Sequence, residues 1–372
     1  KQPGFAPAVE AITVVAGEAP VLHVELAVAA ASQTTTVTAQ APVANVESST
    51  PTTLVGRTSI ARTPGADRSN SLAMITDFVP GAYLVHDQLH VRGGHQVSWL
   101  VDGVPVPNTN IASNVGPQID PKDIDTLEVQ RGSYDAAYGD RTYGVFNIAP
   151  RSGFERDNEA DLVLSAGSFH QTNDALNFGG HSDRFAYFGS VSGNRSNLGL
   201  ETPSAEVIHD ADNGIAGFQS LIFNADARDQ FRLVASQRRD FYQIPNTADQ
   251  QAAGIRDSEQ ESDAFALFSW VRTVNANTLL TVSPFYHYNA ANYDGGPGDY
   301  PISTTDHHAS QYAGAQATLS TILGPHQLQF GFYGFRQRDN QRFGRVFPDH
   351  SQPDISQAEP VDGQLEAEFA VG

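Results

Sequence analysis

The stretch that decides the fold is HVRGGHQVSWLVDGVPV at residues 90–106, followed by IDTLEVQRG at residues 124–132. Short apolar runs bounded by glycine-rich turns are typical of strands, and residues 97–101 are predicted to form one. Asp102-Gly103 directly after this run predicts a tight turn rather than a chemical site. Glycines cluster at the predicted turns, where a reversing chain needs positive φ or close backbone approach. These features predict a small mixed α+β domain.

A different pattern begins after Gly153, where apolar side chains alternate with polar or small ones. Leu176 and Phe178, for example, alternate with Asn177 and Gly179. Short turns and long polar loops roughly alternate between these segments, and the long loops are predicted at residues 194–213, 239–261, 289–310 and 337–360. This asymmetry is typical of a transmembrane antiparallel β-barrel, whose strands are apolar toward lipid and polar toward the lumen. The alternative is a soluble all-β protein with one solvated face, which has the same period of two.

Several short pieces of the chain occur in a fixed order: VPG at 79–81, VRGG at 91–94, LVDGVPV at 100–106, IDTLEVQRG at 124–132, AYG at 137–139, YG at 143–144 and NI at 147–148. In this order and spacing they resemble the plug domain of TonB-dependent outer-membrane receptors. The flanking segments resemble neighbouring parts of one branch of these receptors. The resemblance implies a mainly β fold with four parts: residues 1–31 as the end of a carboxypeptidase-regulatory-like β-sandwich, 32–57 as a tether, 58–152 as the plug, and 153–372 as the N-terminal part of the barrel.

The family implies a barrel of about 22 strands with the plug inside its lumen. Residues 153–372 suffice for roughly ten strands with the predicted loops. A half barrel would expose two unpaired edges to lipid, at a cost of several kcal/mol for each unsatisfied backbone group. We therefore expect the chain to be a fragment of a longer receptor in the cell outer membrane, surrounded by outer-membrane lipid.

Composition excludes several classes of protein. The formal net charge is −20, and Lys1 and Lys122 are the only lysines, so a nucleic-acid partner is not expected. The chain has no cysteine, which removes disulfide scaffolds, thiolate zinc sites and cysteine nucleophiles. No stretch approaches the ~18–20 apolar residues of a membrane-spanning helix.

The tether contains a run of threonines that resembles the TonB box, the segment that pairs as an added strand with the periplasmic energy-coupling protein TonB. Such pairing needs an exposed, strand-prone segment with free backbone groups. An ordinary linker, or a last strand of the upstream sandwich, is the alternative. The predicted box consists of Thr34, Thr35, Thr36, Val37, Thr38 and Ala39.

The plug motif supplies the other candidate residues. In the family, plug arginines that precede glycine pair with acidic barrel residues or face the ligand, although structural roles are favoured here. The residues concerned are Arg92, Gly93, Asp102, Gly103, Arg131, Gly132, Gly139 and Gly144. The resemblance also places a polar loop near the plug apex, which makes Asn108, Thr109 and Asn110 candidate ligand contacts.

Metal and enzyme sites are not expected. His86 and His90 share a face of an extended segment but would stand about 13 Å apart, too far to share one ion. Asp294–Asp299 lacks the spaced carboxylates of a calcium loop and is interpreted as a solvated turn. The chain has no G-x-S-x-G elbow, P-loop or H-E-x-x-H motif. No cofactor, metal or catalytic residue is therefore predicted.

The resemblance implies a receptor that binds an extracellular solute and imports it to the periplasm when TonB pulls on the plug. Receptors of this type import iron chelates, cobalamin, oligosaccharides or peptides, and the sequence does not name the ligand. The alternatives are a signalling receptor without transport, a soluble or surface β-rich binding module, and a nonfunctional truncated product.

Overall fold

The computed structural model describes residues 51–63, 78–85, 88–109, 119–132, 134, 138, 143–200, 202–296, 298–361 and 365–371. The predicted end of a regulatory-like sandwich and the predicted TonB box, Thr34–Ala39, lie outside these residues.

The first body is a small mixed sheet with the strand order β1-β6-β7-β4-β5. Strands β4 and β7 are parallel, and the other neighbours are antiparallel. The helix α1 and the hairpin β2–β3 flank it. The elements are β1 (Thr52–Gly56), α1 (Arg57–Arg62), β2 (Ala82–Val85), β3 (Gln88–Val91), β4 (Val97–Val101), β5 (Val104–Pro105), β6 (Ile124–Gln130) and β7 (Gly144–Pro150).

The local signals in the sequence are confirmed in this sheet. Asp102 and Gly103 have φ of 50° and 78°, so two residues with positive φ join β4 to β5, as a tight hairpin turn requires. The 3₁₀ turn η2 (Pro121–Asp123) begins after Asp120, whose side chain accepts a hydrogen bond from the Lys122 amide at 3.0 Å. Proline lies at the start of this turn, where the missing N–H costs nothing.

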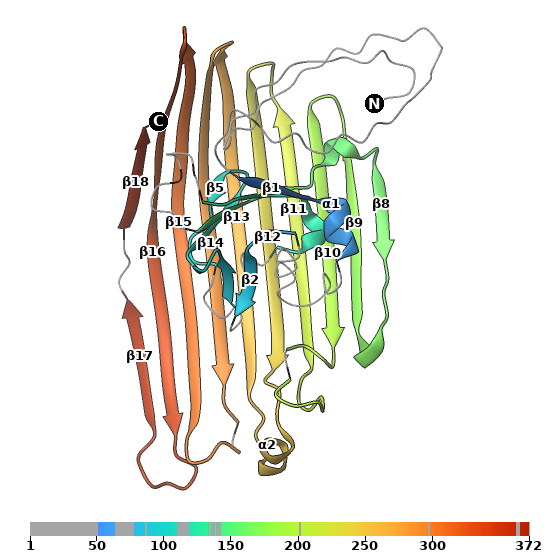
Figure 1. Cartoon of the computed structure of the whole chain (residues 1–372), viewed down its shortest axis with the longest axis vertical. Coiled ribbons are helices and arrows are strands. Elements are labelled where there is room, and N and C mark those ends of the chain that lie inside the picture. Colours follow the sequence, from blue (N-terminus) through green and yellow to red (C-terminus); the bar gives the residue numbers. More distant parts are fainter. Residues whose placement is uncertain are drawn as a thin grey trace.

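The second body is a large antiparallel sheet in which each strand pairs with the next along the chain. Its two edges are β8 on one side and β17 with β18 on the other, because β17 and β18 pair with successive lengths of β16. Figure 1 shows these strands standing side by side, with the small sheet in front of them. The strands are β8 (Glu159–Val163), β9 (Thr172–His181), β10 (Phe185–Ser196), β11 (Asp212–Asn224), β12 (Asp229–Gln243), β13 (Ser258–Asn275), β14 (Thr278–Asp294), β15 (Ser303–Leu323), β16 (His326–Val346), β17 (Ile355–Val361) and β18 (Leu365–Val371).

The two faces of the large sheet have opposite character. In β9, Leu176 and Phe178 are exposed while Asn177 between them is buried. In β10, Val191 is exposed while its neighbours Ser190 and Ser192 are buried. Apolar side chains therefore face outward and polar ones inward, the reverse of a soluble sheet and the arrangement of strands that face lipid. No helix in the described part of the chain is long and apolar enough to cross a membrane.

The predicted long loops are shorter than expected, because the strands extend into them. The connections between strands on one side are residues 197–211, 244–257, 295–302 and 347–354. Pairing of β14 with β15 continues to Asp294 opposite Thr305, well inside a predicted loop. Where both faces of a strand pair are in water, apolar and polar residues no longer alternate in the sequence. The backbone pairing of the two strands nevertheless continues there. Among these connections, residues 244–257 contain the short helix α2 (Ala248–Ala253).

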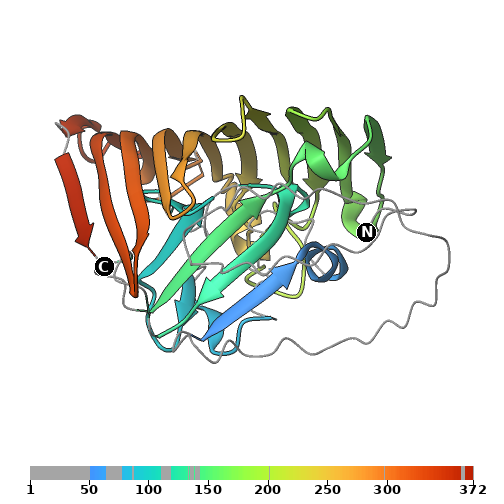
Figure 2. The same ribbon diagram turned by 90° about the horizontal axis from the view of Figure 1, so that it is seen from above.

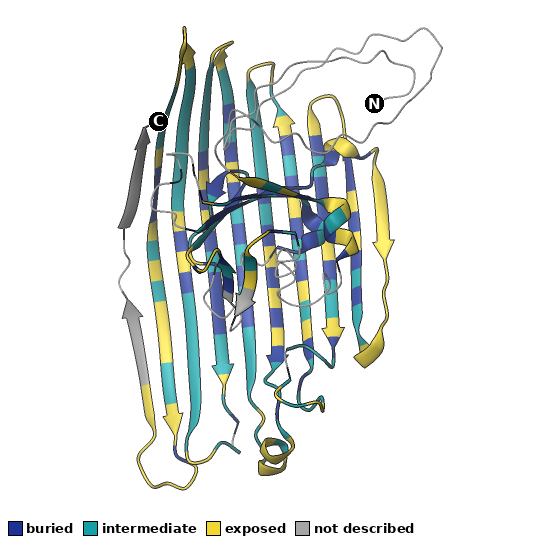
Figure 3. Cartoon of the chain, in the orientation of Figure 1, coloured by how far each residue is buried: buried dark blue, intermediate teal, exposed yellow. Residues whose placement is uncertain are grey.

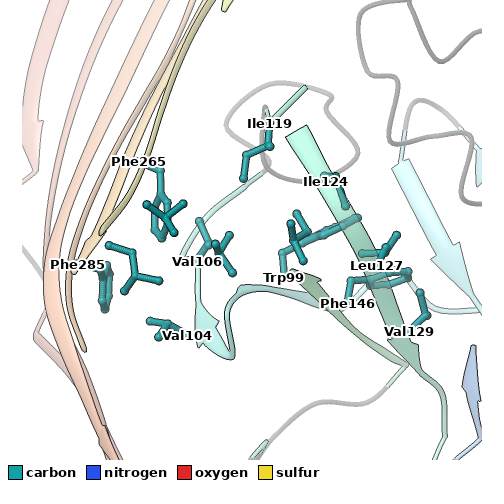
Figure 4. Packing of buried hydrophobic residues seen from close by; sticks show 14 of the residues in the cluster. Trp99, Val104, Val106, Ile119, Ile124, Leu127, Val129, Phe146, Phe265 and Phe285 are labelled. Atoms are coloured by element: carbon teal, nitrogen blue, oxygen red, sulfur yellow. The ribbon is translucent and has the colours of Figure 1, made fainter. Parts of the chain in front are cut away.

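The small sheet lies in the concave face of the large one, as the view from above shows (Figure 2). Burial is concentrated at mid-height of the large sheet, behind the small body (Figure 3). Phe265 of β13 and Phe285 of β14 project toward Val104 and Val106 of the small body and share one buried cluster with them (Figure 4). The two bodies are thus held together partly by apolar contact.

Candidate functional site

The candidate site is the interface between the small body and the polar face of the large sheet. One part of it is formed by residues 105–109, which begin at the last residue of β5. Side chains of the large sheet donate hydrogen bonds to main-chain carbonyls of this segment: Tyr333 Oη to Pro105 O at 3.4 Å, His287 to Pro107 O with Nδ1 at 2.9 Å, and Asn289 Nδ2 to Asn108 O. The sheet therefore holds this segment mainly through its backbone.

Asn108, a predicted ligand contact, lies against the wall of the large sheet. It has a φ of 46°, and its side chain donates to Tyr312 Oη at 2.8 Å. Tyr312 is buried and stacks on His287 with ring centroids 5.7 Å apart. Thr109 is buried as well, and Asn110 lies outside the described residues. The ligand contact of these three residues stays a prediction.

The segment Asp120–Asp123 forms a second polar contact with the large sheet. Ser192 Oγ donates to Asp120 Oδ2 at 2.8 Å, and Lys122 Nζ donates to Asn173 Oδ1. Both partners belong to strands β9 and β10, at the opposite side of the interface from Asn108.

Asp123 is the most strongly perturbed acid of this segment. Burial raises its pKa to about 8, and the nearby Asp120 carboxylate acts in the same direction. The Ser190 hydroxyl and the cations of Arg151 and Lys122 oppose the shift without cancelling it. At neutral pH this carboxyl group therefore holds its proton for most of the time.

An ion pair joins the two bodies at Asp102 and Arg232. Arg232 Nε lies 2.9 Å from Asp102 Oδ2, and Arg232 Nη2 donates to Pro150 O at 3.4 Å. Burial raises the pKa of Asp102, and the Arg232 guanidinium opposes that shift. Sequence reasoning missed Arg232, although an arginine on the inward face of the strand Phe231–Val234 was a usable signal.

The predicted plug arginines connect parts of the small body to one another. Arg131 donates to Pro80 O at 2.6 Å and to Thr53 Oγ1 at 3.1 Å. A Cβ on Gly132, which has a φ of 91°, would overlap the Arg92 guanidinium. The described contacts of Arg131 are thus within the small body. The ion pair between the two bodies takes its cation, Arg232, from the large sheet.

The predicted glycines occupy turns or crowded positions where they are described. Gly93 has a φ of 93°, in the turn after β3. A Cβ on Gly144 would lie 3.1 Å from the Phe146 ring. Gly139 lies outside the described residues.

The histidines do not gather into a shared site in the described part. His90 lies edge-on to His95 with ring centroids 5.6 Å apart, and His86 lies outside the described residues. His307 pairs with Asp294 at 2.9 Å on the other body. Among the described residues, no group of three or more His, Asp or Glu side chains is placed to hold a metal ion.

Comparisons with known proteins agree with this geometry. Residues 44–145 match the family model described as the TonB-dependent Receptor Plug Domain. No curated protein sequence matches the chain.

Solved structures show similarity over both bodies. The copper transporter OprC has a TM-score of 0.65 at 16% identity, covering 83% of this chain and 51% of that chain. The siderophore receptor PiuA from Acinetobacter baumannii has a TM-score of 0.57 at 13% identity, with coverages of 84% and 53%. The Ferric-Catecholate import receptor Fiu from E. coli K12 has a TM-score of 0.60 at 16% identity, with coverages of 87% and 56%. The chain thus spans about half the length of these structures and shares their fold.

Proposed function

Because residues 44–145 of this chain are a TonB-dependent receptor plug domain, we propose that the chain works in an outer-membrane receptor that binds an extracellular solute and imports it with energy from TonB. Receptors of this family reside in the bacterial outer membrane and catalyse no covalent reaction. The expected plug, the partial antiparallel barrel sheet and the outer-membrane localisation are confirmed, whereas the regulatory-like sandwich at residues 1–31 stays a prediction.

The observation that carries the proposal is the polar seal between plug and sheet. The pairs Ser192–Asp120 and Asp102–Arg232 join the plug to the inward face of the sheet through groups that water can also satisfy. Exchanging the Ser192–Asp120 hydrogen bond for hydrogen bonds to water changes stability by only about 1 kcal/mol. A seal of this kind blocks the lumen at rest, and opening it also separates Val104 and Val106 from Phe265 and Phe285.

The order of the plug strands supports a mechanical role for the N-terminal side. Among the described strands, β1 lies at an edge and pairs only with β6, from Thr52 opposite Gln130 to Gly56 opposite Thr126. A pull on the chain before Thr52 therefore loads this edge strand first. In our proposal TonB binds Thr34–Ala39 by strand addition and peels β1 away before the rest of the plug moves.

The edges of the large sheet support function within a closed barrel. β8 and the β17–β18 edge each present backbone groups that no described strand pairs. Such groups are not tolerated in lipid. We therefore propose that further strands close this sheet in the working receptor, and the truncated-product and soluble-module alternatives become outcomes of the test.

The first test is the heat-modifiability of the native protein. Outer-membrane fractions are run on a gel with and without boiling and probed with an antibody to residues 58–152. The proposal expects a mass well above the 40.0 kDa of the 372 residues and a shift on boiling. A band near 40 kDa without a shift, or absence from the membrane fraction, overturns it in favour of a truncated or soluble product.

The second test addresses TonB. The chain has no cysteine, so Thr36→Cys creates a unique thiol for disulfide trapping with single-cysteine variants of TonB. Thr58→Cys, at an exposed position of α1, is the matched control. Trapping at position 36 that exceeds trapping at position 58 supports the box, and equal or absent trapping contradicts it.

A further inference from the structure

His287 lies fully buried at the contact between plug and sheet, with both ring nitrogens engaged. Nδ1 is 2.9 Å from Pro107 O of the plug. Nε2 is 2.8 Å from Asp263 Oδ2 on the neighbouring strand β13. The His287 side chain has no exposed surface, so water does not satisfy either nitrogen.

The two partners decide how many protons this arrangement contains. A peptide carbonyl only accepts hydrogen bonds, and so does an ionised carboxylate, whereas a neutral imidazole carries a single N–H. Both contacts are satisfied when the ring is doubly protonated, or when Asp263 carries a proton that it donates to Nε2. Either arrangement holds one proton more than a neutral ring beside a carboxylate.

We propose that His287 and Asp263 form a proton-binding latch that holds the plug segment at Pro107 against the barrel wall. When the extra proton leaves, His287 keeps its N–H on one side only, and a nitrogen lone pair faces an oxygen lone pair on the other. Either the contact with Pro107 or the contact with Asp263 then becomes repulsive. Because the latched form binds the proton and the released form does not need it, the latch holds at low pH and loosens as the pH rises.

The charged groups around the pair come from four strands. Glu261 lies on the same face of β13 as Asp263. Arg238 of β12 lies opposite Asp263 in the sheet register, and Tyr312 of β15 lies opposite His287. Asp339 of β16 acts electrostatically on Tyr312. The described plug residues 105–109 contribute no charged side chain.

Arg238, which lies opposite Asp263 in the sheet register, already has an acidic partner. Arg238 makes two hydrogen bonds to Asp240, at 2.5 and 2.9 Å. Arg238 is therefore paired with Asp240 and is not a free counter-ion for the His287–Asp263 pair.

The release is local, because other contacts of the same segment do not depend on the proton. Asn289 and Tyr333 donate to the carbonyls of Asn108 and Pro105 through groups that do not titrate in this range as donors. Val106 stays in the apolar cluster. The latch therefore changes the stiffness of residues 105–109 and leaves the rest of the plug in place.

Hydrogen exchange measured by mass spectrometry on the native receptor in outer-membrane vesicles tests the latch between pH 5.5 and 8.5. The reporter is the peptide that covers residues 104–110, with rates corrected for intrinsic exchange at each pH. The central strand β7 provides the reference peptide. The wild type should lose protection as the pH rises, by up to about tenfold per pH unit, the most that one proton can produce.

Two variants separate the latch from ordinary packing. Asp263→Asn replaces the carboxylate with an amide that donates to Nε2, so a neutral ring satisfies both sides and protection should be high at every pH. His287→Phe keeps an aromatic ring of similar size but removes both contacts, so protection should be low at every pH.

The outcomes are decisive in each direction. The latch is supported if protection depends on pH in the wild type but not in either variant. Protection should then be constantly high in Asp263→Asn and constantly low in His287→Phe. A flat wild-type profile overturns it, and so does Asp263→Asn with an unchanged pH dependence. If His287→Phe does not assemble, the Asp263→Asn comparison still decides. The latch concerns the resting plug, so its failure leaves the proposed import function standing.

Discussion

Asp123→Asn is predicted to remove the loss of plug stability that the wild type shows as the pH rises. The carboxyl group has a pKa of about 8 in the folded plug, against an ordinary value of 3.8. Between these two values the unfolded chain is ionised while the folded plug keeps its proton, so the wild type loses stability as the pH rises from about 4 to about 8. Above pH 8 both states are ionised, and the loss is complete. An amide does not ionise and removes this dependence.

The magnitude follows from the same two values. A difference of about four pKa units corresponds to a penalty on the order of 5 kcal/mol in the wild type at pH 9. One oxygen of Asp123, Oδ1, is buried without a hydrogen-bond partner, so an amide nitrogen at that position leaves its N–H donors unsatisfied at a cost of about 1–3 kcal/mol. We therefore expect the variant to be slightly less stable than the wild type at pH 4 and several kcal/mol more stable at pH 9, with a crossover between.

The assay is urea unfolding of the detergent-extracted receptor, followed by Trp99 fluorescence. Trp99 is 2% exposed and stacks on Phe146 at 4.6 Å, so its emission reports plug packing. Trp270 is the other tryptophan in these residues, and Trp270→Phe removes its signal. Asp125→Asn is the matched control, because Asp125 lies in the same segment with 45% of its side chain exposed. A wild-type midpoint that is constant or rises from pH 4 to 8, or variant and wild-type curves that stay parallel, would refute the reasoning.

Three further substitutions test other contacts of the plug. Arg232→Leu leaves the buried Asp102 carboxylate without its cation and should lower the free energy of unfolding by about 3–5 kcal/mol at pH 7. Adding Asp102→Asn should restore most of the urea midpoint. An Arg232→Leu variant as stable as the wild type would argue against the ion pair. Gly94→Ala puts a methyl group into the Tyr143 ring and should lower the plug's unfolding midpoint by the equivalent of about 1–3 kcal/mol, and an unchanged midpoint would mean that the ring moves freely. Gly103→Ala, at a φ of 78°, should cost about 1–2 kcal/mol from backbone strain alone, measured in the same titration, and a stabilising effect would be incompatible with the turn geometry.

Local rules predicted the features that depend on neighbours in the chain. The Asp102-Gly103 turn follows from the φ that these residues tolerate, and the outward position of Leu176 and Phe178 follows from the period of two. The order of short motifs between residues 79 and 148 was sufficient to identify the plug family.

Contacts between distant segments could not be predicted in the same way. Arg232 meets Asp102, and His287 meets Pro107, because sheet register and curvature bring them together across the interface. The sequence of a single segment determines neither the register nor the curvature of the sheet. The strand ends were missed for a different reason: β15 and β16 lose their alternation where water wets both faces, so hydropathy has no period to show there.

The length of β15 and β16 has a consequence for access to the receptor. Each has 21 residues, which corresponds to about 70 Å of extended chain, or about 50 Å of height at a 45° tilt. The apolar band of an outer-membrane barrel is only about 25 Å tall. Much of the length of β15 and β16 therefore extends beyond the bilayer as hydrogen-bonded sheet. In the proposed receptor, the entrance on the side of residues 295–302 and 347–354 is therefore a stiff collar whose width is set by the geometry of the sheet.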